Sequence, residues 1–377
     1  MSTGTSQRQY AHQMLREIHE QPTSLTTALD HYVRGGALDE ASFNPVYQWF
    51  RDHHQIVFSA SGSSRHASLA GEIMIEDVSG MPVDVEYASE YVYREINTLT
   101  NPGIIVVSQS GETADTLAAL REANRRRHGT IAVTNVENST MAREAEISLP
   151  TWAGRELAVP ATKSFTAQLL VLNLIALSSG VALQTLAGET LTAHFRELAA
   201  LPALITRQLD GWEQQMEQIA KALHNVETYL FLGRGIHYAI AREGALKLKE
   251  SAYLQAEGYP SGELKHGPNA LVGSTSAIVA IATVDRSEPG SVIRYEKSVQ
   301  LLQDMKKQGA MVVALGNAGD DEVASAATHF VPIAPTREHL LPITEVIPLQ
   351  LLAYFSAIQR GIDVDSPRNL TKAVLAE

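Results

Sequence analysis

A group of hydroxyl side chains follows an apolar stretch near residue 110. Ser108, Ser110 and Thr113 lie directly after the apolar residues 103–107, which predict a buried strand, and a helix is expected from about Ala114. Free backbone N–H groups at a helix N-terminus, with short hydroxyl donors beside them, form an anion site. An ordinary helix cap explains one such hydroxyl. Three within six residues favour a phosphate, and a loop without lysine is not the nucleotide type. The ligand is therefore predicted to be a phosphorylated small molecule.

A second group of chemically active residues lies in the last third of the chain. Glu243, Lys247 and Glu250 are spaced i, i+4, i+7, so a helix places them on one face. A solvated row of ion pairs is the plain alternative, but nearby residues are apolar, which favours a face directed into a cleft. There a carboxylate beside an ammonium can transfer protons. His266, in the glycine-rich turn 262–268, is a candidate general acid or base.

One strand–loop–helix pattern occurs twice and predicts the fold. Residues 59–66 correspond to residues 230–237, and the same offset places Glu72 on Glu243. Each copy continues as strand, helix, strand, which indicates an α/β fold with parallel sheets flanked by helices, a flavodoxin-like or Rossmann-like three-layer sandwich. The expected parts are an N-terminal helical segment 1–30, a first domain 31–195, a second domain 205–362 and a tail 363–377.

The two copies differ in chemistry. Where the first has the hydroxyl loop 108–113, the second has residues 284–289, which include acidic side chains and a proline. These would oppose phosphate binding, so one phosphate site is expected in each chain, in the first copy. The link between the copies is expected as a helix between Leu191 and Leu209.

Composition limits the class of protein. A length of 377 residues accommodates two domains, and 45% hydrophobic with 19% charged residues is typical of globular proteins. A net charge of −12 argues against general nucleic-acid binding. We expect no signal peptide and no membrane span, because no stretch approaches ~20 apolar residues. The absence of cysteine excludes disulfides, thiolate metal sites and thiol nucleophiles. A cytoplasmic protein is expected.

Several strings in this order resemble a known family. They are residues 108–116, 161–165, 231–235, 243–250, 262–268 and 363–372. The chain resembles proteins with two sugar isomerase (SIS) domains, above all the isomerase half of glutamine:fructose-6-phosphate amidotransferases, over about residues 10–377. The string at 161–164 is somewhat more similar to stand-alone amino-sugar-phosphate deaminases of that superfamily.

The resemblance implies roles for the candidate residues. The residues that would hold the sugar phosphate are Ser108, Gln109, Ser110 and Thr113, with Ser63 and Ser64 beside them. The sugar itself would contact the backbone of Val159. Glu250 would move the proton between C1 and C2, supported by Glu243 and Lys247, and His266 of the partner subunit would open the ring. Lys372, in a tail closing over the site, would handle the open-chain ketose.

Departures from the family decide the expected reaction. The amidotransferases carry a glutaminase domain with an N-terminal cysteine, whereas this chain has neither. Pro160 and Ala161 replace an expected Ala-Ser, and Thr371 replaces an alanine. We therefore expect a homodimeric deaminase, without cofactor or metal, that converts glucosamine 6-phosphate to fructose 6-phosphate and ammonia. The alternatives are synthesis from ammonia, free or delivered by a separate glutaminase, aldose–ketose isomerisation, cleavage of a fructosamine 6-phosphate, and a sugar-phosphate sensor without turnover.

Overall fold

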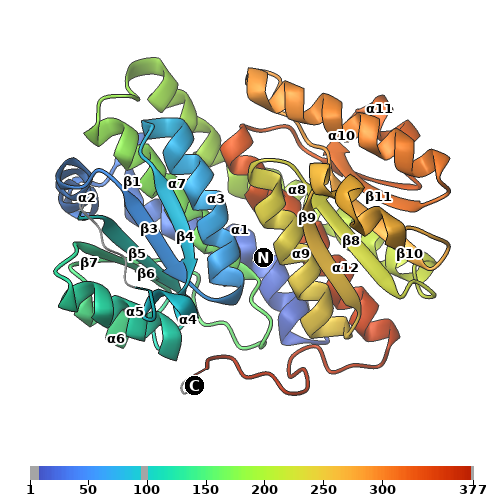
Figure 1. Cartoon of the computed structure of the whole chain (residues 1–377), viewed down its shortest axis with the longest axis horizontal. Helices are drawn as coiled ribbons and strands as arrows, with labels where there is room; N and C mark the ends of the chain where they lie inside the picture. The colour runs from blue at the N-terminus through green and yellow to red at the C-terminus, as the bar shows by residue number, and fades with distance from the viewer. Residues whose placement is uncertain (1–7, 95–100, 375–377) are drawn as a thin grey trace, which may run out of the picture.

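The computed structural model describes residues 8–94 and 101–374 (Figure 1). The first and last expected segments, 1–30 and 363–377, and the first expected domain, 31–195, each lie partly outside these ranges, at residues 1–7, 375–377 and 95–100.

The first half is built on a parallel sheet with the strand order β4-β3-β5-β6-β7. Its strands are β3 (Ile56–Ala60), β4 (Val83–Tyr87), β5 (Gly103–Ser108), β6 (Thr130–Thr134) and β7 (Ile147–Pro150). Its helices are α2 (Glu40–Asp52), α3 (Gly62–Ser79), α4 (Ala88–Tyr91), α5 (Ala114–Arg125), α6 (Thr140–Glu144) and α7 (Lys163–Ala182). Helix α1 (Gln13–Tyr32) and a short hairpin, β1 (Val33–Arg34) and β2 (Ala37–Leu38), precede them.

The second half repeats this arrangement with the order β9-β8-β10-β11-β12. Its strands are β8 (Thr228–Gly233), β9 (Gln255–Pro260), β10 (Ser276–Ile281), β11 (Met311–Asn317) and β12 (His329–Ile333). Its helices are α9 (Ile236–Ala252), α10 (Pro289–Lys307), α11 (Asp321–Ala326) and α12 (Leu341–Gln359), with short 3₁₀ segments η1 (Ser261–His266), η2 (Pro268–Leu271) and η3 (Glu338–Leu340). Helix α8 (Gly188–Ala222) joins the halves and confirms the expected helical link.

The shared strand order places two loops at each sheet's switch point. In both sheets the first strand lies between the second and third, which is the flavodoxin-like order. Ligands bind in such sheets at the carboxyl ends of the two strands where the order reverses. In the first half these ends are those of β3, which is followed by the start of α3 with Ser63, and of β5, which ends at Ser108.

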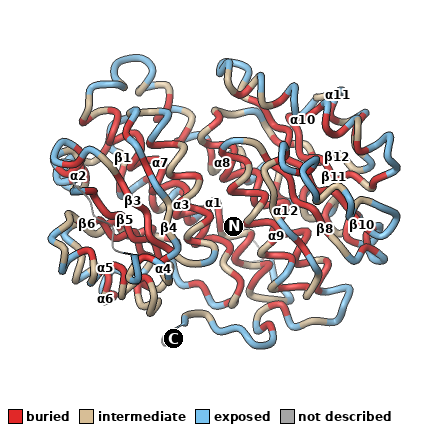
Figure 2. Tube along the Cα trace, viewed as in Figure 1, coloured by how far each residue is buried: buried red, intermediate tan, exposed pale blue. Residues whose placement is uncertain are grey.

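The main core lies between the two sheets. Helices α1, α3, α7, α8, α9 and α12 fill this space and pack on one another, whereas α5 and α10 cover the outer faces (Figures 1 and 2). Helix α7 is apolar on all sides and nearly all of its residues are buried, as expected for a helix enclosed by protein. One continuous core therefore fixes the two halves to each other.

We expected no stretch that approaches the length and apolar composition of a membrane span, and this expectation is wrong. Two segments, Lys163–Ala182 and Glu338–Gln359, are long and apolar enough to cross a membrane. In this fold each is 94% buried inside the protein, because each packs between the two sheets. Their apolar surface thus serves the core.

Candidate functional site

The hydroxyl loop hydrogen-bonds to itself rather than capping the helix. The hydroxyls of Ser108 and Thr113 lie 3.0 Å apart, and that of Ser108 accepts from the N–H of Gly111 at 3.1 Å. Ser110 accepts from the N–H of Glu112 at 3.1 Å. Thr113 is the N-cap of α5 but its side chain makes no capping bond. The simple capping explanation therefore fails, and the hydroxyls shape a compact loop at the end of β5.

Gly111 is required by the shape of this loop. Its φ is +67°, and a Cβ atom built on it would lie 2.1 Å from the hydroxyl oxygen of Ser139, the N-cap of α6. A side chain there would be strained and would also clash. The loop is thereby held against the start of α6.

Ser63 and Ser64 lie in the first turn of α3, which follows β3 at the switch point. Ser64 is buried and accepts a hydrogen bond from Gln168 of α7 at 3.0 Å. Ser63 hydrogen-bonds to Glu243 of α9, a contact that lowers the pKa of that carboxyl. The start of α3 thus connects α7 of the first half with the charged helix α9 of the second.

The charged residues of α9 form a buried chain. Lys247 Nζ lies 3.3 Å from a carboxylate oxygen of Glu243 and donates to Glu250. Glu243 and Lys247 have 0% and 1% of their surface exposed, and the Glu250 side chain has 17%. At the other end, His66 of α3 lies 2.8 Å from Glu243. A solvated row of ion pairs is excluded, and the predicted common face is confirmed.

Burial and neighbouring charges shift the pKa values of Glu250 and Glu243 in opposite directions. Burial raises the pKa of Glu250, and Lys247 only partly offsets this. Burial also acts to raise the pKa of Glu243, but the charge of Lys247 and the His66 hydrogen bond outweigh it, so that pKa is lowered. Burial lowers the pKa of Lys247, yet its two carboxylate neighbours outweigh this and raise it. Glu250 is therefore the carboxyl suited to exchanging a proton.

The C-terminal tail crosses from the second half to the first (Figure 1). The carbonyl of Asp365 accepts from the N–H of Val159, which leaves only the carbonyl of Val159 for a ligand, and Val374 accepts from the N–H of Ala114. Lys372 Nζ donates to Glu156 at 2.5 Å and to the carbonyl of Ala158 at 2.7 Å. Its charge also acts on Glu250.

Two buried carboxyls beside the tail were not predicted from the sequence. Glu156 accepts hydrogen bonds from Thr162, Ser164 and Lys372. Glu17 of α1 accepts from the N–H groups of Leu157 and Ala158, and burial raises its pKa to about 7. Neither lies in a periodic pattern or a motif. Charged residues stand next to both in the sequence, Arg16 before Glu17 and Arg155 before Glu156, so the local sequence gives no signal of their burial. His66, also missed, lies two residues after Ser64 in the same helix α3.

His266 is not brought to this site within one chain. It ends η1, is exposed, and makes no hydrogen bond or ion pair among the residues that the structure describes. Its predicted role as an acid or base therefore stays a prediction. The side chain of Gln109, within the hydroxyl loop, is half-buried and also has no hydrogen bond among the described residues.

The tertiary structure gathers a possible ligand set that spacing could not reveal. His19, Asp210 and Glu213 place one ligand atom each within 4.8 Å of one another. Arg8 already binds both oxygens of Glu213, at 2.6 and 2.8 Å, and approaches Asp210 at 3.4 Å. An arginine supplies the positive charge here, so the cluster is an ion-pair network.

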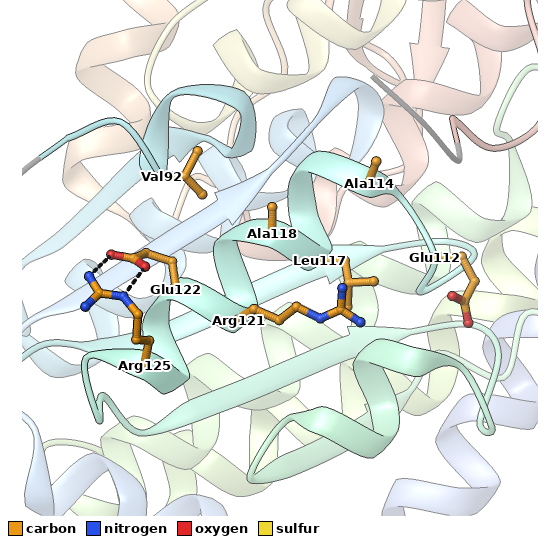
Figure 3. Close-up of a pocket in the computed structure, with 8 residues that line it drawn as sticks. All are labelled: Val92, Glu112, Ala114, Leu117, Ala118, Arg121, Glu122 and Arg125. Carbon is orange, nitrogen blue, oxygen red and sulfur yellow. Dashed lines mark hydrogen bonds and ion pairs between the residues drawn. The ribbon is translucent and has the colours of Figure 1, made fainter.

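A pocket of about 660 Å³ lies on the outer face of α5 and is bordered at one end by Glu112 of the hydroxyl loop. Figure 3 shows its lining, with Arg125 paired to Glu122 and Arg121 lying along the helix. None of the candidate site residues lines it. We place the candidate site at the switch point of the first sheet because the hydroxyl loop, the buried charges and the tail meet there.

Comparisons agree with this architecture. The SIS domain profile matches residues 50–178 and 222–360. Glutamine–fructose-6-phosphate aminotransferases from Caldanaerobacter subterraneus and Symbiobacterium thermophilum are 40% and 41% identical over 98% of this chain. The chain spans 59% of the length of either relative.

Solved structures show the same fold. The C-terminal domain of the aminotransferase from Francisella tularensis has a TM-score of 0.87 and 34% identity, covering 95% of this chain and 98% of that one. A glucosamine-6-phosphate deaminase from Thermotoga maritima has a TM-score of 0.72 and 24% identity, covering 96% and 99%, which shows the fold alone. The chain belongs to the SIS domain family and is homologous to the isomerase domain of glutamine–fructose-6-phosphate aminotransferases.

Proposed function

We propose that this chain is an amino-sugar-phosphate deaminase that converts glucosamine 6-phosphate and water to fructose 6-phosphate and ammonia. One observation carries the proposal. Glu250 ends a buried chain of charges, its pKa is raised by burial, and the charge of Lys372 acts on it from the tail. A proton-transferring carboxyl beside a lysine and a hydroxyl loop suits a phosphorylated sugar with a reacting carbonyl.

The chemistry requires one proton acceptor and one water. In the open-chain sugar, C1 is an aldehyde and C2 carries the amine. Glu250 takes the hydrogen from C2 and returns it to C1, while one amine hydrogen reaches O1. The product is an imine at C2, which water hydrolyses to the ketone and ammonia. Glu243 and Lys247 hold Glu250 in place and set its proton affinity.

The hydroxyl loop is proposed to anchor the phosphate. Ser108, Gln109, Ser110 and Thr113 would supply hydrogen bonds, with Ser63 and Ser64 across the switch point. The binding energy at the anchor can hold C1 and C2 against Glu250. The carbonyl of Val159, beside the tail, would contact the sugar.

Ring opening is proposed to involve a second subunit. His266 is exposed and unpaired within the described part of one chain. A homodimer in which His266 of the partner subunit reaches the site would complete the acid–base set. Removal of this residue should then reduce turnover of cyclic sugar more than turnover of an open-chain analogue.

The nitrogen source separates the proposal from its strongest alternative. The relatives at about 40% identity are named as glutamine-dependent aminotransferases, which favours synthesis of glucosamine 6-phosphate as the second candidate. The 377-residue chain contains no cysteine, so glutamine hydrolysis through a thiol nucleophile is impossible within it. The donor would then be ammonia, either free or delivered by a separate glutaminase, and net synthesis by the isolated chain should appear only at high ammonium.

The test is to incubate the purified chain separately with glucosamine 6-phosphate, galactosamine 6-phosphate and fructosamine 6-phosphates, and to measure ammonia and ketose. Ammonia and fructose 6-phosphate from the first support the proposal. Interconversion of aldose and ketose phosphates without ammonia supports the isomerase instead, and release from a fructosamine 6-phosphate alone supports the deglycase. Binding without any turnover would identify a sensor. Formation of glucosamine 6-phosphate from glutamine by this chain would contradict the account.

The Lys372→Ala variant refines this test. Lys372 is proposed to act on the open-chain ketose through its amine. The variant should therefore lose amine chemistry more than hexose-phosphate isomerisation. Equal loss of both would mean that Lys372 serves only to close the tail over the site.

A further inference from the structure

A second pocket lies between the two halves, separate from the hydroxyl loop. Its volume is about 370 Å³, and it is lined by residues of α3, α9, β9 and the end of β4. Three of its lining side chains are cationic: Arg65, Arg242 and Lys249. The first two are 177 positions apart in sequence, and the packing of α3 on α9 brings them together.

Arg65 lacks partners for much of its guanidinium group. The group lies 3.7 Å from the ring centroid of Tyr87, and Nη2 donates to the carbonyl of Val85 at 3.4 Å. The Nε and Nη1 atoms are buried and have no hydrogen-bond acceptor. Leaving buried charged donors unsatisfied is costly. No acceptor among the described residues therefore satisfies these two nitrogens, and no carboxylate neutralises the charge of Arg65.

Arg242 approaches the same tyrosine from the second half. Its two terminal nitrogens donate to the hydroxyls of Tyr238 at 3.3 Å and Tyr87 at 3.2 Å. Neither Arg242 nor Arg65 forms an ion pair with a carboxylate among the described residues. Two guanidinium groups thus converge on one phenol, where the hydrogen bond from Arg242 lowers the pKa of Tyr87 and the charge of Arg65 adds to this.

The carboxylates nearby do not neutralise the pocket. Glu257 lines it, but accepts from the hydroxyl of Tyr259 and from Gln255. Glu72 acts on Arg65 from a greater distance without forming an ion pair. Three cations therefore face one lining carboxylate. In a chain of net charge −12, such an excess of unpaired positive charge indicates an anionic ligand.

We propose that this pocket binds the phosphate group of a small molecule, as a second anion site in addition to the hydroxyl loop. Arginine forks match phosphate oxygens with two parallel hydrogen bonds, and 370 Å³ accommodates a small phosphorylated metabolite. His66 also lines the pocket, and its ring nitrogen hydrogen-bonds to Glu243. The bound anion therefore lies next to the chain of charges that ends at Glu250.

Counting bound phosphates tests the proposal. Equilibrium dialysis with radiolabelled inorganic phosphate should find two sites per wild-type chain. The double variant Arg65→Met with Arg242→Met should lose one site, and Ser110→Ala with Thr113→Ala should lose the other. Each arginine alone should account for an affinity change of about 10- to 100-fold. Displacement of the label from the arginine pocket by glycerol 3-phosphate would identify a phosphate ester as the preferred ligand, and resistance to it would identify the free ion.

Matched variants keep the result interpretable. Arg155→Met removes an exposed arginine outside the pocket and should retain both sites. Should the double methionine variant not fold, Arg242→Gln alone should still weaken one site at least about tenfold. A single site that the Ser110 and Thr113 changes remove and the arginine changes leave intact would overturn the proposal. If the arginine changes remove one phosphate site but the Ser110 and Thr113 changes remove none, the result would instead contradict the phosphate anchor of the proposed function.

Discussion

Lys372 Nζ lies 2.5 Å from a carboxylate oxygen of Glu156, and this contact ties the C-terminal tail to the first half of the protein. Glu156 is buried, and although burial acts to raise its pKa, the charge and hydrogen bond of Lys372 outweigh it and lower it. The pair therefore stays ionised. It keeps the lysine ammonium at a defined position while its charge acts on Glu250.

Replacing this carboxylate should uncouple the lysine from the site. Glu156→Gln keeps an acceptor for the N–H of Thr162 but removes the charge that holds Lys372. We expect kcat to fall about 10- to 100-fold with a smaller change in KM, because Lys372, the proposed catalytic lysine, loses its position. Ser164→Ala removes another hydrogen bond to Glu156 without touching the ion pair, and should stay near wild type. A Glu156→Gln variant with normal kcat would show that the contact only stabilises the tail.

The proton acceptor can be tested within the charged face of α9. Glu250→Gln retains the shape of the side chain and should lower kcat about 10²- to 10⁴-fold while substrate still binds. The exposed residue Glu263, changed to Gln, is the matched control and should have no effect. If Glu243→Gln proves more damaging than Glu250→Gln in steady-state kinetics, the roles of these two carboxyls are reversed.

The hydroxyl loop should control substrate affinity. Ser110→Ala and Thr113→Ala each remove a donor to a charged phosphate, which is worth roughly 1.5 to 3 kcal/mol. We therefore expect KM to rise about 10- to 100-fold in each variant, with kcat also reduced where the anchor helps to orient the sugar. Thr192→Ala, on an exposed turn of α8, provides the control. Unchanged kinetics in both loop variants would mean that the phosphate binds elsewhere.

Glu17 should make stability fall as the pH rises. Burial raises its pKa from 4.5 to about 7, so the native state keeps a proton that the unfolded chain releases. The free energy of unfolding therefore decreases between pH 4.5 and 7 and levels off above pH 7. Glu17→Gln is neutral throughout, so its stability relative to wild type should increase across this window by up to about 3 kcal/mol.

Urea unfolding from pH 5 to 8 measures this difference. Glu189→Gln, which changes an exposed glutamate of α8, should show none of it. A constant difference between Glu17→Gln and wild type over the whole range would show that Glu17 is ionised in the native state, with its two backbone N–H partners outweighing burial.

The sequence by itself determined the repeated α/β fold and the two local motifs. Buried strands such as residues 103–107 and the helical spacing of Glu243, Lys247 and Glu250 are short-range patterns, so they can be read from adjacent residues. The same holds for the hydroxyl loop, because a strand, a glycine and a helix start follow one another directly. The sequence could not distinguish a membrane span from a core helix at residues 163–182, since helices of both kinds are uniformly apolar.

Only the tertiary structure decided which distant residues meet. Glu156 and Lys372 are 216 positions apart, and no local sequence pattern at either residue predicts their contact. The joining of His66 to Glu243 depends on the packing of α3 against α9, as does the meeting of Arg65 and Arg242 at Tyr87. Burial also settled the proton affinities, because a carboxyl such as Glu250 differs from any exposed glutamate only through its surroundings. Long-range packing and desolvation are properties of the folded chain, and they bring the hydroxyl loop and the charged face of α9 together in the candidate site.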